Sequence, residues 1–364
     1  MNTAREKSVE GLRVILAVAA KDVVDAMKNK TTISVIIGMF LMMLSAQAFP
    51  FIMKLAAIPR MIVYDAGSSR LIAELEDDGQ YRLVKVDSKL ELEEILVDMN
   101  AEVLGLVIPP GFDQALASGE PAELEGYVVW SSRSAASELK SNLEAHLERL
   151  LGQPVRVSVA GNVVYPSPEG SGHLVMVAGV LVVALGVVGS LMVPYLMFEE
   201  KQTHTMEVLL VSPATAGQIV AGKALTGLFY CLTAVAVAFA FNYNAFTHWG
   251  IAVLAAICGA LVAIAVGLVL GSLFETAQQM SLWVSIPLVI IFLPVMLKAT
   301  ELSLPAALAS FLSWLPTAAL ADVFLLSFSG NATLARALPE LALVLAWAVP
   351  VYAAEVWIVR RSDR

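Results

Sequence analysis

Long apolar stretches without charged side chains are the feature that most constrains this chain. Residues 251–274 form one such stretch. An α-helix of that length, rising about 1.5 Å per residue, crosses the roughly 30 Å hydrocarbon core of a bilayer. Five others are also strongly apolar, with at most two charged residues each, at residues 31–53, 174–197, 218–241, 280–297 and 338–359. Hydrophobic residues make up 58% of the chain, too many for a water-soluble protein of this size. The sequence therefore predicts a polytopic α-helical membrane protein with six transmembrane helices, the first at residues 31–53.

Basic residues flank the two outermost stretches. Six precede the first stretch and three follow the last: Arg5, Lys7, Arg13, Lys21, Lys28 and Lys30, then Arg360, Arg361 and Arg364. Because short flanks rich in Lys and Arg stay in the cytoplasm, we expect both termini there. Six crossings then place the segment between the first two stretches outside, and the segment after the second stretch inside. We expect a multi-pass protein of the cell (plasma) membrane.

The segment at residues 56–172 differs in composition from the rest of the chain. It holds nineteen of the 32 acidic residues but only nine of the 23 basic ones, which is typical of an acidic, soluble domain. Short β-branched runs predict strands at residues 61–64, 81–86, 103–108, 125–130 and 155–159. Helical periodicity predicts helices at residues 90–99 and 135–151. We expect an inserted extracytoplasmic mixed α/β domain.

Residues 1–30 are predicted to form a cytoplasmic amphipathic entry helix that lies along the membrane surface. Its apolar side chains recur at helical spacing opposite its charged ones: Leu12, Ile15, Leu16, Ala19, Val23 and Met27 opposite Arg13, Lys21, Asp22, Asp25 and Lys28. A soluble helix that packs on a cytoplasmic hairpin is the alternative.

Residues 173–364 are predicted to form a five-helix transmembrane domain that contains one irregular part, at residues 300–330. The apolar pieces 304–314 and 318–328 in that part are interrupted by Pro305, Pro316 and Asp322. Apolar pieces of 10–14 residues are more typical of re-entrant than of spanning segments. We expect a re-entrant outer segment, with two unusually short further spans as the alternative.

The connection at residues 199–213, between the second and third apolar stretches, is a charged segment with the marks of a helix. Thr203 or Thr205 can cap it, Met206 and the two following leucines form an apolar edge, and Pro213 ends it. A simple connection needs only a few residues, so we expect this cytoplasmic hairpin to dock a soluble partner. A solvated amphipathic connection is the alternative.

Residues 217–224 resemble a phosphate-binding loop, but the chemistry of such a loop is missing. Ala224 replaces the Ser or Thr that would hold magnesium, and no strand precedes the segment. We expect Lys223 to extend to the cytoplasmic interface, and Glu355 likewise. The four histidines and two cysteines lack metal-ligand spacing. We therefore expect no catalytic, cofactor-binding or metal-binding residues in this chain, and no nucleic-acid partner.

The hairpin resembles the first cytoplasmic loop of ABC-2 type transporter permeases. The resemblance rests on Glu199-Glu200-Lys201, Thr205, Glu207, Leu209-Leu210, Ser212-Pro213 and Gly222-Lys223. Two further segments resemble the exporter subgroup with a large domain between the first two spans: Val107-Ile108-Pro109-Pro110-Gly111-Phe112 with Ala117-Ser118-Gly119-Glu120-Pro121, and Phe274-Glu275-Thr276-Ala277-Gln278-Gln279.

The resemblance implies a permease subunit of an ATP-binding cassette exporter. In that family the loop forms a coupling helix that docks on a separate ABC ATPase subunit, which would hold ATP and magnesium. The ATPase-coupling residues implied here are Glu199, Glu200, Lys201, Thr205, Glu207, Leu209, Leu210 and Pro213. The permease would pair in the lipid bilayer as a homodimer, or as a heterodimer with a related permease.

Another class of function is also compatible with the domain order. A membrane-anchored sensor or secretion-accessory protein would bind a ligand through its extracytoplasmic domain. An ion-driven secondary transporter is disfavoured, because the chain lacks paired intramembrane carboxylates and broken helices in corresponding halves. Several methionines lie in the apolar stretches, among them Met42, Met43, Met280 and Met296, and they favour hydrophobic cargo.

Overall fold

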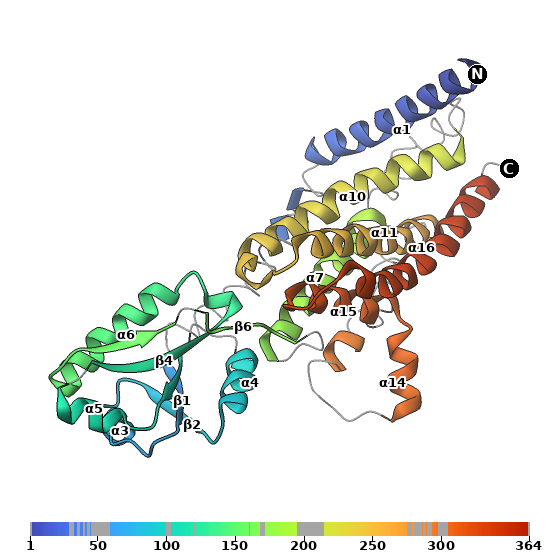
Figure 1. Cartoon of the computed structure of the whole chain (residues 1–364). Coiled ribbons are helices and arrows are strands. Elements are labelled where there is room, and N and C mark those ends of the chain that lie inside the picture. The colour runs from blue at the N-terminus through green and yellow to red at the C-terminus, as the bar shows by residue number, and fades with distance from the viewer. Residues whose placement is uncertain are drawn as a thin grey trace.

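The computed structural model describes residues 2–28, 59–99, 103–119, 121–159, 161–167, 172–194, 215–274 and 305–362, with residues 293–297 and a few isolated positions. These residues form a sheet region at one end and a helical body at the other (Figure 1). Both marked termini lie at the end of the helical body that is remote from the sheet.

The sheet region is built on a mostly parallel sheet in the order β2-β1-β3-β4-β5. Only β3 and β4 pair antiparallel, and a short β6 lies beside β4. The strands are β1 (Arg60–Asp65), β2 (Arg82–Val86), β3 (Gly105–Ile108), β4 (Ala122–Val129), β5 (Val155–Ser158) and β6 (Val163–Val164). The helices of this region are α3 (Leu71–Asp78), α4 (Lys89–Met99), α5 (Phe112–Ser118) and α6 (Ala136–Leu151).

Helices cover both faces of the sheet, so the central strand β3 is buried along its whole length. Residues of α3, α5 and α6 share one core with the sheet, and α4 packs on the opposite face through Leu92 and Leu96. A Cβ atom at Gly105 would lie 2.7 Å from the side chains of both leucines, so only glycine allows α4 this close. Such two-sided burial is typical of parallel sheets covered by crossover helices.

All five predicted strands and both predicted helices of this region are present, with boundaries that shift by a few residues. The sequence did not predict α3, α5 or β6. The helices α3 and α5 have eight and seven residues, too few to show a helical period. The described region spans residues 60–164, within the predicted 56–172.

The helical body contains three described helices long and apolar enough to cross a membrane: α10 (Ala216–Phe241), α11 (Trp249–Leu273) and α16 (Leu334–Ser362). They coincide with three of the six predicted spans. Part of the predicted span 174–197 forms α7 (Gly172–Val187), a shorter apolar helix that continues into a π-helical turn, η2 (Val188–Met192). Most of the predicted spans 31–53 and 280–297 lies outside the described residues, so the count of six stays a prediction.

Glycine allows the closest approach inside the helical body. A Cβ atom at Gly189, in the π-helical turn, would lie 2.5 Å from the side chain of Ala263 on α11. A Cβ atom at Gly267 would collide with the carbonyl oxygen of Gly189. The two backbones therefore meet without intervening side chains, which is how small residues stabilise helix pairs in lipid.

The predicted irregular segment forms two helices, α14 (Ala306–Ser313) and α15 (Pro316–Phe328), bent by 79° at the break between them. The indole N–H of Trp347 donates to the carbonyl oxygen of Trp314 at this break, over 3.0 Å. Trp347 is close to the midpoint of α16, so the corner between α14 and α15 lies beside the middle of that helix. A bent pair of this kind is either a broken span or a re-entrant loop.

The N-terminal helix α1 (Asn2–Lys28) packs along α10 (Figure 1). Its buried face contains Val18, Ala19 and Asp22, whereas Leu12 and Leu16 are 58% and 50% exposed. The predicted helix is present, but the placement of Asp22 on its polar face was wrong. Asp22 lies within the face that meets α10, next in helical order to Val18 and Ala19.

Candidate functional site

Lys223 is the most unusual side chain at the end of the helical body where the termini lie. It sits in α10, has no exposed surface, and its Nζ is 3.6 Å from Oδ2 of Asp22 on α1. The prediction that Lys223 extends to the interface was wrong, because α1 covers this part of α10. A buried ammonium group needs an opposite charge, and Asp22 supplies it.

The same part of α10 is held to α1 by close packing and a hydrogen bond. A Cβ atom at Gly222 would lie 2.7 Å from the side chain of Val18. The hydroxyl of Thr226 donates to the carbonyl oxygens of Gly222 and Ala19, over 3.2 and 3.4 Å. Thr215 caps α10 in a reciprocal pair with Gln218. The start of α10 is therefore a well-defined helix end fixed against α1.

These contacts also explain the role of residues 217–224, the segment that resembles a phosphate-binding loop. Residues 217–224 form the first turns of α10 and not a loop. Gly222 serves close helix packing, and the ammonium group of Lys223 faces a carboxylate. In a phosphate loop the glycines free backbone N–H groups for phosphate, and the lysine is available to it. Neither holds here.

Glu355 joins two helices of the body. Its side chain is fully buried in α16, and the hydroxyl of Ser272 on α11 donates to its Oε1 over 2.6 Å. The prediction that this carboxylate extends to the interface was therefore wrong. Glu355 faces the neighbouring helix because it lies on the inward side of α16. The periodicity of a single helix does not reveal that side when both of its faces are largely apolar.

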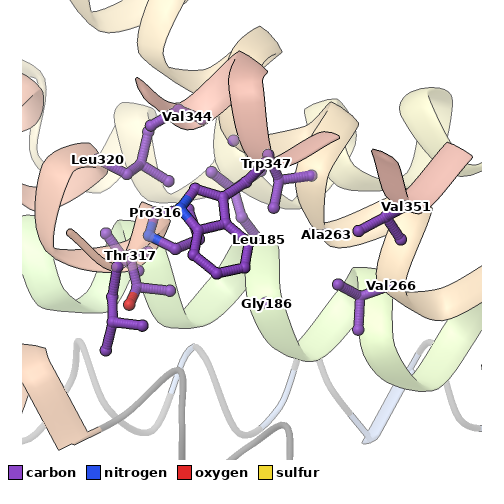
Figure 2. A pocket seen from close by; sticks show the side chains of 14 residues that line it. Leu185, Gly186, Ala263, Val266, Pro316, Thr317, Leu320, Val344, Trp347 and Val351 are labelled. Carbon is purple, nitrogen blue, oxygen red and sulfur yellow. The ribbon is translucent and has the colours of Figure 1, made fainter. Parts of the chain in front are cut away.

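A cavity of about 310 Å³ lies among α7, α11, α15 and α16 (Figure 2). Its walls are almost entirely aliphatic, with Trp347 on one side. Among the described residues that line it, the only hydroxyl belongs to Thr317, in the first turn of α15. Its Oγ1 is buried and has no hydrogen-bond partner in the part of the chain that the structure describes. The cavity suits an uncharged, apolar molecule.

A polar and aromatic cluster connects the sheet region with the helical body. The guanidinium group of Arg133 stacks on Trp130 at 3.7 Å and donates to the carbonyl oxygens of Trp130 and Asn244, over 2.7 and 3.0 Å. The indole of Trp130 donates to the carbonyl oxygen of Phe246 over 3.3 Å and stacks on Tyr165. Asn244 and Phe246 belong to the connection between α10 and α11. This junction did not appear in the sequence prediction, since its partners lie more than 100 positions apart.

The predicted coupling hairpin is outside the residues that the structure describes. This holds for all of its predicted ATPase-coupling residues, which are Glu199, Glu200, Lys201, Thr205, Glu207, Leu209, Leu210 and Pro213. The structure does describe where the chain resumes, at the Thr215 cap of α10. Among the described residues, no three His, Cys, Asp or Glu side chains gather closely enough to hold a metal ion.

A family model described as ABC-2 family transporter protein matches residues 28–354. The match covers the sheet region and the helical body from α7 to most of α16, and it begins at the last residue of α1. The chain belongs to this family. No curated protein matches the chain. As an ABC-2 family transporter protein, it is a membrane protein whose apolar helices are able to span a bilayer. Its α/β region and the four-helix cavity are parts of that transporter.

Proposed function

We propose that this ABC-2 family protein is the permease subunit of an ATP-driven exporter. The hairpin at residues 199–213 docks on a separate ABC ATPase subunit, which holds ATP and magnesium. The hairpin and both termini face the cytoplasm, and the sheet region lies outside. The observation that carries the proposal is the family match over residues 28–354, because it includes the hairpin as well as the helices.

The packing of α1 on α10 supports a route from the hairpin into the membrane. The hairpin is followed at once by the Thr215 cap, and two turns later by the buried contact of Lys223 with Asp22. A displacement of the hairpin would therefore move α10 and α1 together. Coupling between an ATPase and a translocation path needs an element that both sites bias. The tied pair of helices is such an element.

A complete exporter in this proposal contains two permeases and two ATPase subunits. The permeases form a homodimer, or a heterodimer with a related chain, around a translocation path in the bilayer. The marked termini lie at the end of the molecule opposite the sheet region, which fits a cytoplasmic face and an outer face (Figure 1). The permease itself binds no cofactor.

Charge reversal on the hairpin tests the proposal. Replacing Glu199, Glu200 and Glu207 with Lys places like charges against a basic or polar groove on the ATPase, which costs on the order of several kcal/mol. We expect the variant to insert normally and to lose both ATPase co-purification and export. The matched control reverses three exposed carboxylates of the sheet region, Glu74, Glu123 and Glu148, and should keep both. Undiminished co-purification and export in the hairpin variant would refute the proposal and favour the sensor alternative.

A further inference from the structure

We propose that the cavity among α7, α11, α15 and α16 is a binding site for an uncharged amphipathic molecule. A hydrocarbon chain fills the aliphatic space, and an acceptor oxygen at one end, such as an ester carbonyl, takes a hydrogen bond from Thr317. The site belongs to a single permease chain and needs neither ATP nor the ATPase.

The walls of the cavity determine the chemistry of the ligand. All four helices supply branched aliphatic side chains, which include Leu185 from α7, Val266 from α11, Leu320 from α15 and Val344 from α16. No charged side chain lines the cavity among the residues that the structure describes, so a charged ligand would lose its hydration without compensation from them. A volume of about 310 Å³ is at the lower end of the range for small-molecule sites. These features select a slender apolar molecule.

Thr317 indicates where the polar end of that molecule lies. Its Oγ1 is buried beside the corner between α14 and α15 and has no partner among the described residues. A buried hydroxyl without a hydrogen bond is unfavourable, and a ligand oxygen would remove that penalty. Water alone is a poor occupant, since a buried water needs two to four polar partners and the other walls offer almost none.

Trp347 shapes the site but does not compete for the acceptor oxygen. Its indole N–H already donates to the carbonyl oxygen of Trp314, which fixes the ring against the corner of α14 and α15. Figure 2 shows Trp347 and Thr317 on the same side of the cavity, with Val266 and Val351 at the other side. Within the described part of the chain, Thr317 is therefore the one lining side chain with a donor available for the ligand.

A photoactivatable probe tests the proposal directly. The probe is the methyl ester of a long-chain fatty acid with a diazirine in the chain, added to the purified full-length protein in nanodiscs without ATP. We expect saturable cross-links to residues 182–186, 262–266 and 344–351, and competition by the unlabelled ester. Cross-links spread evenly over the exposed helix surface, without saturation, would overturn the proposal.

Three variants separate the cavity from the surrounding bilayer. Val266→Phe fills the cavity, and we expect it to reduce saturable labelling at least about tenfold, since steric exclusion removes the site. Thr317→Val keeps the shape but loses the hydroxyl, and we expect an affinity about two- to tenfold weaker. Val253→Phe, on the exposed side of α11, is the matched control and should have no effect. Unchanged labelling in both Val266→Phe and Thr317→Val would refute the site. If Val266→Phe does not fold, competition by the unlabelled ester in the native protein tests the site instead.

Two sources offer this chemistry, a resident membrane lipid and a transported molecule. A further arm adds the ATPase partner and ATP to the probe-loaded permease. Loss of the bound probe during ATP turnover assigns the site to cargo, and retention assigns it to a resident lipid. The binding measurement itself contains no ATPase. Its failure is therefore distinguishable from failure of the proposed exporter function.

Discussion

The ammonium group of Lys223 faces the carboxylate of Asp22 across the contact between α10 and α1, with 3.6 Å between Nζ and Oδ2. Both side chains are almost completely buried, at 1% and 5% exposure. Burying such a pair between two helices costs free energy, because both ions lose their hydration. The pair is therefore a point where a single substitution has a large effect.

Lys223→Met is expected to destabilise the protein by about 3–5 kcal/mol, because it removes the cation that faces a buried carboxylate. The double variant Asp22→Leu with Lys223→Met should recover most of that loss, since an apolar pair of similar volume is often neutral. Thermal unfolding of the purified chain in one detergent measures both. The control is Lys140→Met, which breaks a surface pair with Glu144 and should cost about 1 kcal/mol or less. Equal losses in the single and double variants would contradict a role for the pair.

Gly267→Ala is expected to destabilise the contact between α11 and the π-helical turn of α7. The new Cβ atom meets the carbonyl oxygen of Gly189, which is backbone and has little freedom to move. Overpacking of this kind costs about 1–3 kcal/mol. Gly250→Ala in the same helix is the control, because nothing lies within 4 Å of its Cβ position. Comparable stability of the two variants would mean that the two backbones are not in tight contact.

Arg133→Ala is expected to loosen the junction between the sheet region and the connection of α10 with α11. It removes hydrogen bonds to the carbonyl oxygens of Trp130 and Asn244, and hydrogen bonds from a charged donor contribute about 1.5–3 kcal/mol. Hydrogen exchange of residues 242–248 should become faster. Arg149→Ala provides the comparison, because that side chain donates to the carbonyl oxygen of Ala145 within its own helix. Unchanged hydrogen exchange in Arg133→Ala would show that these hydrogen bonds do not stabilise the junction.

Asp113 makes the sheet region sensitive to acid. The hydroxyl of Ser69 and the backbone N–H of Arg70 donate to its carboxylate and lower the pKa of Asp113 below the ordinary 3.8. A carboxyl whose pKa is lower in the folded than in the unfolded protein stabilises the folded state at any pH above the ordinary pKa. This stability is lost as the pH falls through the pKa of the folded state.

Asp113→Asn should therefore cost about 0.5–1 kcal/mol at neutral pH, a small value because solvent screens this half-buried group. The difference from the native protein should shrink as the pH falls below 3.8. Hydrogen exchange of β1 and β3 reports it. Asp77→Asn, at an exposed carboxylate of α3, should stay within about 0.5 kcal/mol. If the stability difference between Asp113→Asn and the native protein grew as the pH fell, the pKa of Asp113 would be raised in the folded protein and not lowered.

The proposed orientation predicts which cysteines react from outside the cell. In a background without Cys231 and Cys258, an impermeant maleimide should label a cysteine at the exposed position Ser118 but not one at Ser212. The basic flanks of the first and last apolar stretches are the physical reason. A cysteine at Ser362, near the end of α16, is a second inside position. Labelling of a cysteine at Ser212 or Ser362 in intact cells would contradict the proposed orientation.

The five longer strands and the two longer helices of the sheet region could be predicted from sequence because their signals are local. β3, for example, is an apolar run that ends at Pro109-Pro110-Gly111, and that turn signal needs no knowledge of other segments. The helices α10, α11 and α16 were predictable for the same reason, since their length and apolar character are contained in one stretch.

The roles of individual polar side chains depend on distant segments, and these were not predictable. Lys223 and Asp22 are about 200 positions apart, and neither sequence context shows that α1 covers α10. The same holds for Glu355 with Ser272 and for Arg133 with Asn244. The cavity is built from four helices, so no single motif could indicate it. The predicted coupling residues of the hairpin remain a prediction.

The hydrogen bond from Trp347 to the carbonyl oxygen of Trp314 has a consequence for how the last part of the chain folds. A helix that stops inside a bilayer leaves terminal carbonyl groups that no lipid tail can bind. Helix α14 ends at the corner with α15, and an indole from α16 provides a donor there. The turn at residues 314–316 would therefore gain this donor only after α16 has inserted beside it. A helix made later in the chain would then complete a segment made before it.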